Sequence, residues 1–326
     1  MKPHSHLRRT LLGLTLAALL PVGAAWAQAY PSKPITLLVP FPPGGPTDLV
    51  ARVLAKKMSE QMGQSIVIDN KPGANGNIAA VAAARAPADG YTVLYNTSSI
   101  TLSPALYKSL AYDVQRDLAP VALTAVVPLA LVVNPAVPAN NVRDFIAYAK
   151  ANPGKLSYGS AGNGNVTHLA AFQLVRHHDI DATHVPYRGS APADVDLVAG
   201  QIQFMTDTIN SVMPFVKDKR LKLLAVTTSQ RMSLFPDVPT LGETVMPGFE
   251  AGAWQGIMVP ANTPKAVVQR LNAEINKALQ SAEVKEKLAL QGAEPLGSTS
   301  EEYGAYVKKE LARWAAVVKA TGVTLE

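Results

Sequence analysis

Short apolar runs alternate with segments of helical periodicity along most of this chain. Residues 35–39 form an apolar run with the length of a buried strand. In residues 46–62, apolar positions recur every three or four residues between basic ones, which predicts an amphipathic helix. Thr47 or Asp48 is its expected N-cap. The intervening PFPPGGP cannot continue a strand and predicts a tight loop.

The same alternation continues toward the C-terminus and predicts an α/β protein. Strand-like runs are followed by helical segments through short glycine- and proline-rich loops, as expected when helices connect parallel strands. The predicted strands are residues 65–69, 91–95, 156–159, 183–187, 202–206, 221–227 and 256–259, and the predicted helices are residues 78–86, 142–150, 169–175, 193–199, 264–280, 282–291 and 303–320. Residues 96–99, 235–242 and 249–256 are expected to be loops.

One apolar segment, residues 118–133, is long for a single strand and could carry the chain from one lobe to another. Residues 221–227 could carry it back. We therefore predict two α/β lobes of similar build, although no internal repeat indicates a duplication. The predicted division is lobe 1 from residues 28–125 and 229–326, and lobe 2 from residues 126–228.

Residues 1–27 have the pattern of a cleavable secretory signal. Basic residues precede an apolar run at 11–20, and Ala25-Trp26-Ala27 ends in the small-x-small pattern of a signal peptidase site. The apolar run is shorter than the about 20 residues that a membrane span requires. A pair of arginines also leaves twin-arginine export open. We expect an exported, periplasmic protein that begins at Gln28.

Composition excludes several functions. The formal net charge of +6 falls to +3 when residues 1–27, which hold three basic and no acidic residues, are set aside. No dense lysine and arginine stripe remains, so nucleic acid is not expected as a partner. The chain has no cysteine, which excludes disulfides, thiol catalysis and cysteine-ligated zinc.

Polar and glycine-rich loops follow four of the predicted strands, at residues 41–48, 73–77, 96–99 and 159–168. In parallel sheets, ligands bind at the carboxyl ends of the strands. Amides and hydroxyls at helix N-termini suit an anion. Together the loops predict a site that holds a small ligand without transforming it. The first loop alone could equally be a proline-stiffened turn that binds nothing.

Few side chains near these loops suggest catalysis. Ser160 is not a nucleophile elbow because position 158 is not glycine. Gly162-Asn163-Gly164 is an incomplete dinucleotide fingerprint. His177 and His178 lack metal-ligand spacing with their acidic neighbours and His184, so a solvated helix end is favoured over a metal site. No catalytic residue, metal ion or cofactor is expected.

Four side chains keep alternative roles. His168, at the start of a helix, is either a ligand partner or a neighbour of the cap. Asp48 either caps its helix or faces the cleft, whereas Asp207 directly follows a strand and favours the cleft. Phe41 could line a pocket or belong to the core. An aspartate free in the cleft would favour an amino acid, and aspartates occupied as caps would favour a plain carboxylate.

The sequence closely resembles the extracytoplasmic solute receptors of tripartite tricarboxylate transporters, the TctC/Bug family. The resemblance covers essentially the whole chain after residue 27. The segments that carry it are YPSKPITLLVPFPPGGPTDLVAR, NKPGANGN, YGSAGNGNVTHLAA, THVPYRGSAPADVDLVAGQIQFMTD, LAVTTSQRMSLFPDVPTLGE and MVPANTPKAVVQRLNAEI. Ala79 stands where glycine is usual, and Leu102-Ser103-Pro104 where Asn-Pro is common, which puts the ligand's identity in doubt.

This resemblance implies a two-lobed periplasmic binding protein fold, type II, with the ligand cleft between the lobes. It also implies a carboxylate held by backbone amides, hydroxyls and waters rather than by arginine, and a monomeric receptor that serves the membrane subunits of a tripartite tricarboxylate transporter. By position, the expected ligand-binding residues are Phe41, Gly44, Gly45, Thr47, Asp48, Ala74, Asn75, Thr97, Ser98, Ser160, Gly162, Asn163, Thr167, His168 and Asp207.

Our main hypothesis is a periplasmic receptor that captures a small organic anion by closure of its lobes. One alternative is an exported enzyme that acts on a carboxylate with His168 and Asp207 as an acid–base pair. A sensory receptor of the same fold is the other alternative, because signalling would use the same closure.

Overall fold

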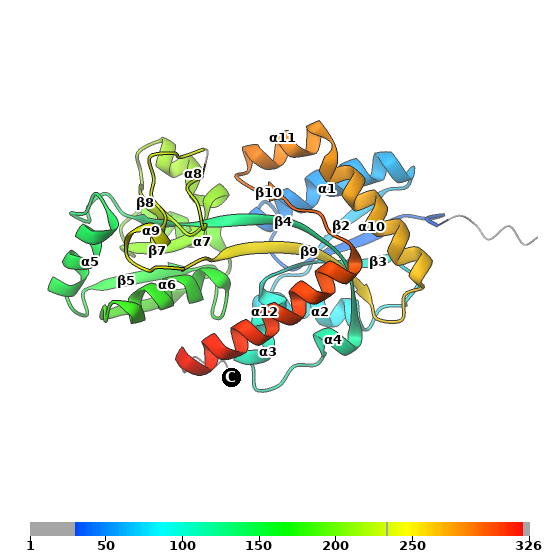
Figure 1. The fold of residues 1–326 in the computed structure, drawn as a ribbon, viewed down its shortest axis with the longest axis horizontal. Coiled ribbons are helices and arrows are strands. Elements are labelled where there is room, and N and C mark those ends of the chain that lie inside the picture. The colour runs from blue at the N-terminus through cyan, green and yellow to red at the C-terminus, as the bar shows by residue number, and fades with distance from the viewer. Residues whose placement is uncertain (1–29, 233, 322–326) are drawn as a thin grey trace, which may run out of the picture.

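The computed structural model describes residues 30–232 and 234–321 of the chain, so the predicted signal segment lies outside the described residues. Two lobes lie side by side and are joined by long strands (Figure 1). Within the described ranges, no helix is both long and apolar enough to cross a membrane. The fold class predicted from the alternation of strands and helices is confirmed.

Lobe 1, on the right in Figure 1, contains both ends of the described chain. Its strands are β1 (Ile35–Val39), β2 (Ile66–Asn70), β3 (Thr92–Thr97), β9 (Gly252–Pro260) and β10 (Glu294–Pro295). Its helices are α1 (Pro46–Met62), the 3₁₀ turn η1 (Ala74–Gly76), α2 (Asn77–Ala84), α3 (Ser99–Leu106), α4 (Val114–Asp117), α10 (Lys265–Gln280), α11 (Ala282–Leu290) and α12 (Ser300–Thr321).

Lobe 2 is formed by the middle of the chain. Its strands are β5 (Leu156–Ser160), β6 (Ala182–Pro186), β7 (Phe204–Thr208) and β8 (Lys222–Val226). Its helices are α5 (Val142–Ala151), α6 (Val166–His177), α7 (Ser190–Val198), α8 (Ile209–Lys217) and α9 (Leu241–Thr244).

Strand β4 (Leu118–Val133) joins the two lobes in one continuous sheet with the order β2-β1-β3-β9-β4-β7-β5-β6. Its first part pairs antiparallel with β9, from Leu118 opposite Pro260 to Pro128 opposite Gly252. Its last part pairs antiparallel with β7 and β8. Residues 118–133 therefore form the inter-lobe strand that their length suggested. The boundaries at 125/126 and 228/229 stay a prediction.

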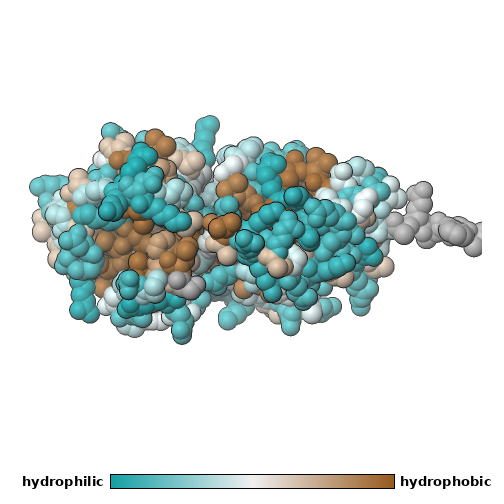
Figure 2. All heavy atoms as spheres, turned by 90° about the horizontal axis from the view of Figure 1, so that it is seen from above, coloured by the Kyte–Doolittle hydropathy of each residue, from teal (hydrophilic) through white to brown (hydrophobic). Residues whose placement is uncertain are grey.

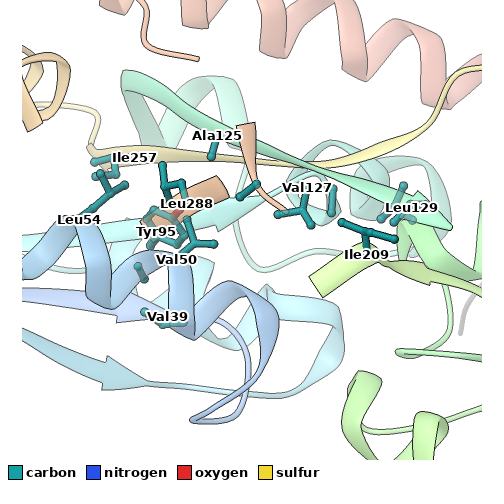
Figure 3. Packing of buried hydrophobic residues seen from close by; sticks show 14 of the residues in the cluster. Val39, Val50, Leu54, Tyr95, Ala125, Val127, Leu129, Ile209, Ile257 and Leu288 are labelled. Atoms are coloured by element: carbon teal, nitrogen blue, oxygen red, sulfur yellow. The ribbon is translucent and has the colours of Figure 1, made fainter. Parts of the chain in front are cut away.

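The largest hydrophobic cluster also runs through both lobes along β4. Figure 3 shows Ala125, Val127 and Leu129 in succession on this strand, with Ile209 of α8 at the lobe 2 end. All four side chains are fully buried. In Figure 2 the surface is mostly polar over lobe 1, and an apolar area is visible on lobe 2. This one cluster therefore continues from lobe 1 into lobe 2 along β4.

Several expected elements differ in the structure. Residues 252–256, expected to be a loop, begin β9, because they pair with β4 in the centre of the sheet. The polar loop expected at 96–99 is replaced by the end of β3 and the start of α3, an unpredicted helix that Ser98 precedes. α8 was also not predicted, and it contains Pro214.

Part of the segment between β8 and β9 packs on lobe 2. α9 contributes Leu241 to the core of lobe 2, where Phe145 of α5 also lies. The backbone of Val226 also forms a bridge with Thr240. Thr240 and Leu241 thus contact lobe 2, and the chain enters β9 at Gly252.

Candidate ligand-binding cleft

Two adjoining cavities lie at the strand ends between the lobes. The inner cavity has a volume of about 210 Å³, and the outer cavity about 550 Å³. They share Phe41, Pro42, Ala161, Arg188 and Gly189, so they form one cleft. Both lobes contribute to each cavity. The four loops selected from the sequence do converge here.

The β1–α1 loop forms the lobe 1 wall of the inner cavity. Gly44 has φ +76°, a conformation that favours glycine, and Pro46 occupies the first position of α1. Gly45 is the N-cap, so the expectation of Thr47 or Asp48 in that role is wrong. The amide of Gly45 is directed at the carbonyl oxygen of Pro42, 3.3 Å away. The glycine amides are therefore used inside the loop, and Thr47, in the first helical turn, is the better anion donor.

Asp48 stabilises this loop through internal hydrogen bonds. Its carboxylate accepts hydrogen bonds from Gly44 N (2.8 Å), Arg52 Nε (2.7 Å) and Asn70 Nδ2 (2.9 Å). Burial opposes ionisation, but these hydrogen bonds prevail and lower the pKa of Asp48. The side chain is buried and lines neither cavity. Asp48 is thus a structural acceptor and not a contact for a ligand ammonium group.

A histidine stack supports the glycine-rich loop of lobe 2. The rings of His168 and His184 are parallel, with centroids 3.8 Å apart. Gly164 N donates to His168 Nδ1 (3.1 Å), and Ser160 Oγ lies 2.7 Å from His184 Nε2. Burial, assisted by His184, lowers the pKa of His168 to about 3, and burial lowers the pKa of His184 to about 4. Both rings are neutral near pH 7, and neither lines the cleft.

We predicted that Asp207 directly follows a strand, but it lies within β7. Its side chain is fully buried. Its Oδ1 accepts hydrogen bonds from Ser190 Oγ (2.8 Å) and Thr208 N (2.6 Å). Ser190 and Thr208 themselves line the inner cavity. Asp207 therefore acts on the cleft only through these two residues.

Asn75 makes hydrogen bonds across the cleft. Its Nδ2 donates to the carbonyl oxygen of Gly164 in lobe 2 (3.1 Å), while its Oδ1 accepts from Ser99 Oγ (2.9 Å) and lies 3.4 Å from Asn165 Nδ2. Asn75 has φ 54°, a left-handed conformation that asparagine tolerates better than most residues. We name this group the Asn75 latch.

Most of the predicted site residues line these cavities or a small adjacent pocket. Those that do are Phe41, Gly44, Gly45, Thr47, Ala74, Asn75, Thr97, Ser98, Gly162, Asn163 and Thr167. Those that do not are Asp48, Ser160, His168 and Asp207, because their polar atoms are used inside the protein.

The sequence prediction missed Arg188, Gly189, Ser190 and Thr208, which line the inner cavity. Arg188 is exposed, follows β6, and is the one charged side chain among the described residues that line the inner and outer cavities. The signal was available: Arg188 directly follows a predicted strand, in the same position as the loops that were selected.

Two lobes that share strands and enclose a cleft at the strand ends define a solute-binding protein of the periplasmic type. Residues 50–323 match the family described as "Tripartite tricarboxylate transporter family receptor", and the chain belongs to this family. The resemblance inferred from the sequence is thereby confirmed. This family consists of solute-binding receptors and not of enzymes.

Similar proteins cover almost the whole chain. Protein BugT of Bordetella pertussis is 38% identical over 320 residues, which are 97% of this chain and 98% of BugT. The structure of R. palustris Rpa4515 with adipate has 38% identity and a TM-score of 0.87, and the match covers 90% of this chain and 99% of that one. MatC from Rhodopseudomonas palustris with bound malate has 34% identity and a TM-score of 0.82, and the match covers 89% of this chain and 100% of MatC.

Proposed function

We propose that this chain is a periplasmic receptor that captures a small organic carboxylate between its lobes and delivers it to the membrane subunits of a tripartite tricarboxylate transporter. Export would depend on the signal-like residues 1–27. Family membership supports the transport role. The adipate and malate in two similar structures support a carboxylate as the ligand.

The charge of the cleft is the observation that carries the proposal. Among the described residues that line the inner and outer cavities, Arg188 is cationic and no side chain is acidic. Asp48 and Asp207 are occupied by internal hydrogen bonds, so neither is available for an ammonium group. The hydroxyl-bearing residues Thr47, Ser98 and Thr167 are among those that line the inner cavity. This combination favours a plain carboxylate over an amino acid.

Closure would couple capture to delivery. The cleft has walls from both lobes, and the Asn75 latch already joins them. A ligand that contacts both walls binds the closed form better and shifts the equilibrium toward it. The membrane subunits would then distinguish the closed receptor from the open one.

Calorimetry on residues 28–326 tests the ligand class. The protein should first be unfolded and refolded to remove any carried ligand. We expect adipate or another small dicarboxylate to bind, and adipamide, which has a similar shape without charge, to bind at least about a hundredfold more weakly, because hydrogen bonds to charged groups are worth 1.5–3 kcal/mol. Equal affinity for adipate and adipamide, or binding of amino acids alone, would contradict the proposal.

Delivery needs a separate experiment. Uptake of the labelled ligand should be measured in cells with the cognate transporter, with and without this receptor. We expect uptake only when both are present. Ligand binding without receptor-dependent uptake would retain the binding role and reject delivery.

A further inference from the structure

A second buried carboxyl group, Asp194, lies one helical turn after Ser190 on α7, and Ser190 donates a hydrogen bond to Asp207. Asp194, on α7, is 2% exposed, and its Oδ2 accepts a short hydrogen bond from Ser211 of α8. Asp207 is 0% exposed. The two carboxyls interact electrostatically, and burial followed by the charge of Asp207 raises the pKa of Asp194. Burial likewise raises the pKa of Asp207.

Within the described part of the chain, no cation neutralises the pair. Neither aspartate forms an ion pair in residues 30–232 and 234–321. Two ionised carboxylates in this position would each bear the cost of burial and would also repel each other. At least one of them must therefore carry a proton at neutral pH.

The hydrogen bonds show where this proton can lie. Each carboxyl has one oxygen that accepts hydrogen bonds, Asp207 Oδ1 and Asp194 Oδ2. The other two oxygens, Asp207 Oδ2 and Asp194 Oδ1, are buried without a partner. One proton between these oxygens would satisfy both, because a protonated carboxyl donates and a carboxylate accepts.

We propose that Asp194 and Asp207 share one proton at neutral pH and that this pair orients the hydroxyl groups of Ser190 and Thr208 in the ligand cleft. The Ser190 hydroxyl donates its single proton to Asp207, and the Thr208 hydroxyl lies 3.3 Å from the same oxygen. Both hydroxyls then offer lone pairs rather than protons to the inner cavity, which suits a water molecule that bridges to the carboxylate of the ligand. The two aspartates are positioning residues.

Other titratable groups on the surrounding elements are few. The pair lies on α7 and β7, which pack against α6, α8, β4 and β5. Asp196 on α7 accepts a hydrogen bond from Tyr187, and Tyr158 on β5 and His168 on α6 stack on His184. Lys217 on α8 and Arg176 and His177 on α6 are exposed. β4 carries no titratable side chain. Changes in the proton of the pair should therefore dominate the titration at this place.

Carbon-13 NMR of the aspartate carboxyl groups tests the shared proton without any ligand. Resonances are assigned from their loss in Asp194→Asn and Asp207→Asn. We expect one of the two carboxyls to titrate above pH 7 and its resonance to respond to the other substitution. Titration of both groups near the ordinary value of about 3.9 would overturn the proposal.

Asparagine substitutions test the geometry. The amide of a single asparagine can donate in place of the shared proton, so each single variant should unfold within a few degrees of the wild type. In the double variant two amides face each other, so its unfolding temperature should fall by more than the sum of the decreases in the two single variants. Asp218→Asn, at an exposed acid of the same lobe, is the matched control. Additive losses would contradict a shared proton.

The consequence for binding rests on the proposed function and is tested with adipate. Wild-type affinity should fall when the pair loses its proton at alkaline pH, by up to about tenfold per pH unit for one linked proton. Asp194→Asn should remove this dependence, and an unchanged dependence would refute the positioning role. If adipate bound at no pH, the proposed ligand class would fail, and the NMR titration would still decide the shared proton.

Discussion

The two walls of the cleft are built on different electrostatic principles. In lobe 1 the buried acid Asp48 has three hydrogen-bond donors, among them the cation Arg52. In lobe 2 the buried acids Asp194 and Asp207 have no cation, and the cleft cation Arg188 forms no ion pair within the described ranges. In the lobe 1 wall the charge of the buried acid is therefore neutralised by Arg52, whereas the lobe 2 wall carries buried acids whose protonation can change.

This difference shows where solution conditions act. Breaking the Asp48 network should affect the stability of the fold, because its partners are internal. Changes of pH and salt should act mainly through lobe 2, where Asp194, Asp207 and Arg188 form no ion pair within the described residues. The substitutions below separate these effects.

Asp48→Ala should have the largest effect. It removes a buried carboxylate that accepts hydrogen bonds from Gly44, Arg52 and Asn70, so we expect a loss of about 3 kcal/mol in the free energy of unfolding. Urea titration measures it. Asp69→Ala is the control, since Asp69 pairs with Lys71 at the surface and should cost below about 1 kcal/mol. Equal losses would show that Asp48 does not brace the loop.

The pH dependence of stability comes next. The lowered pKa values of His168 and His184 mean that the unfolded chain binds more protons below pH 6.5, so stability falls on acidification toward pH 4. The raised pKa values of Asp194 and Asp207 have the opposite sign: their contribution is present at low pH and is lost as pH rises through the folded-state values. The two pairs should largely cancel between pH 4 and 6.

Two variants should tilt this balance in opposite directions. On acidification from pH 6 to 4, the free energy of unfolding of Asp194→Asn should decrease relative to that of the wild type. For His184→Gln it should increase relative to the wild type. Each difference should be up to about 1.4 kcal/mol per pH unit. Urea titrations at each pH, compared as differences, remove the contribution of surface carboxylates. Parallel profiles for both variants would reject the opposition between the two pairs.

Arg188→Gln should weaken the binding of adipate by about tenfold, because an exposed charged contact gives less than a buried one. The effect should shrink at high salt, which screens an exposed guanidinium. Arg143→Gln, on the exposed face of α5 and outside both cavities, is the matched control. Calorimetry at two ionic strengths decides, and equal affinities for the two variants would exclude Arg188 from binding.

The smallest effect is expected at the Asn75 latch. Asn75→Gly keeps the left-handed backbone and removes the bond to Gly164, so the closed form should lose about 1 kcal/mol and the affinity about fivefold. Small-angle scattering would report a more open ligand-free population. Lys219→Gly, also at a positive φ but in a lobe 2 turn, controls for the added glycine. A latch variant with unchanged affinity and shape would rule out this contribution.

The sequence predicted the fold well because the strand and helix periodicities are local signals. Residues 35–39 and 118–133 form strands as predicted, since their apolar runs match the sheet that buries them. The start of β9 was missed because AGAWQG resembles a loop, and only its position between β3 and β4 makes it a strand. α8 was missed for a similar reason, because Pro214 weakens its helical pattern.

The cleft was predicted in outline and misjudged in its charges. Loop positions follow from strand ends, so Phe41, Ser98 and Thr167 could be selected from the sequence. Whether an aspartate faces a cavity depends on which donors surround it in three dimensions, and this information is absent from local sequence. The carboxylates of Asp48 and Asp207 therefore accept hydrogen bonds inside the protein instead of facing the cleft. Arg188, in an equivalent loop, lines the cleft and was overlooked.

The strand that joins the lobes also limits how such a receptor can diversify. Because β4 pairs with β9 in lobe 1 and with β7 and β8 in lobe 2, a recombination break within it would disturb the strand register in both lobes and expose strand edges. Lobes cannot be exchanged as independent modules. New ligand preferences would arise more readily by point substitution in the cleft loops, at positions such as Arg188, than by reassortment of lobes.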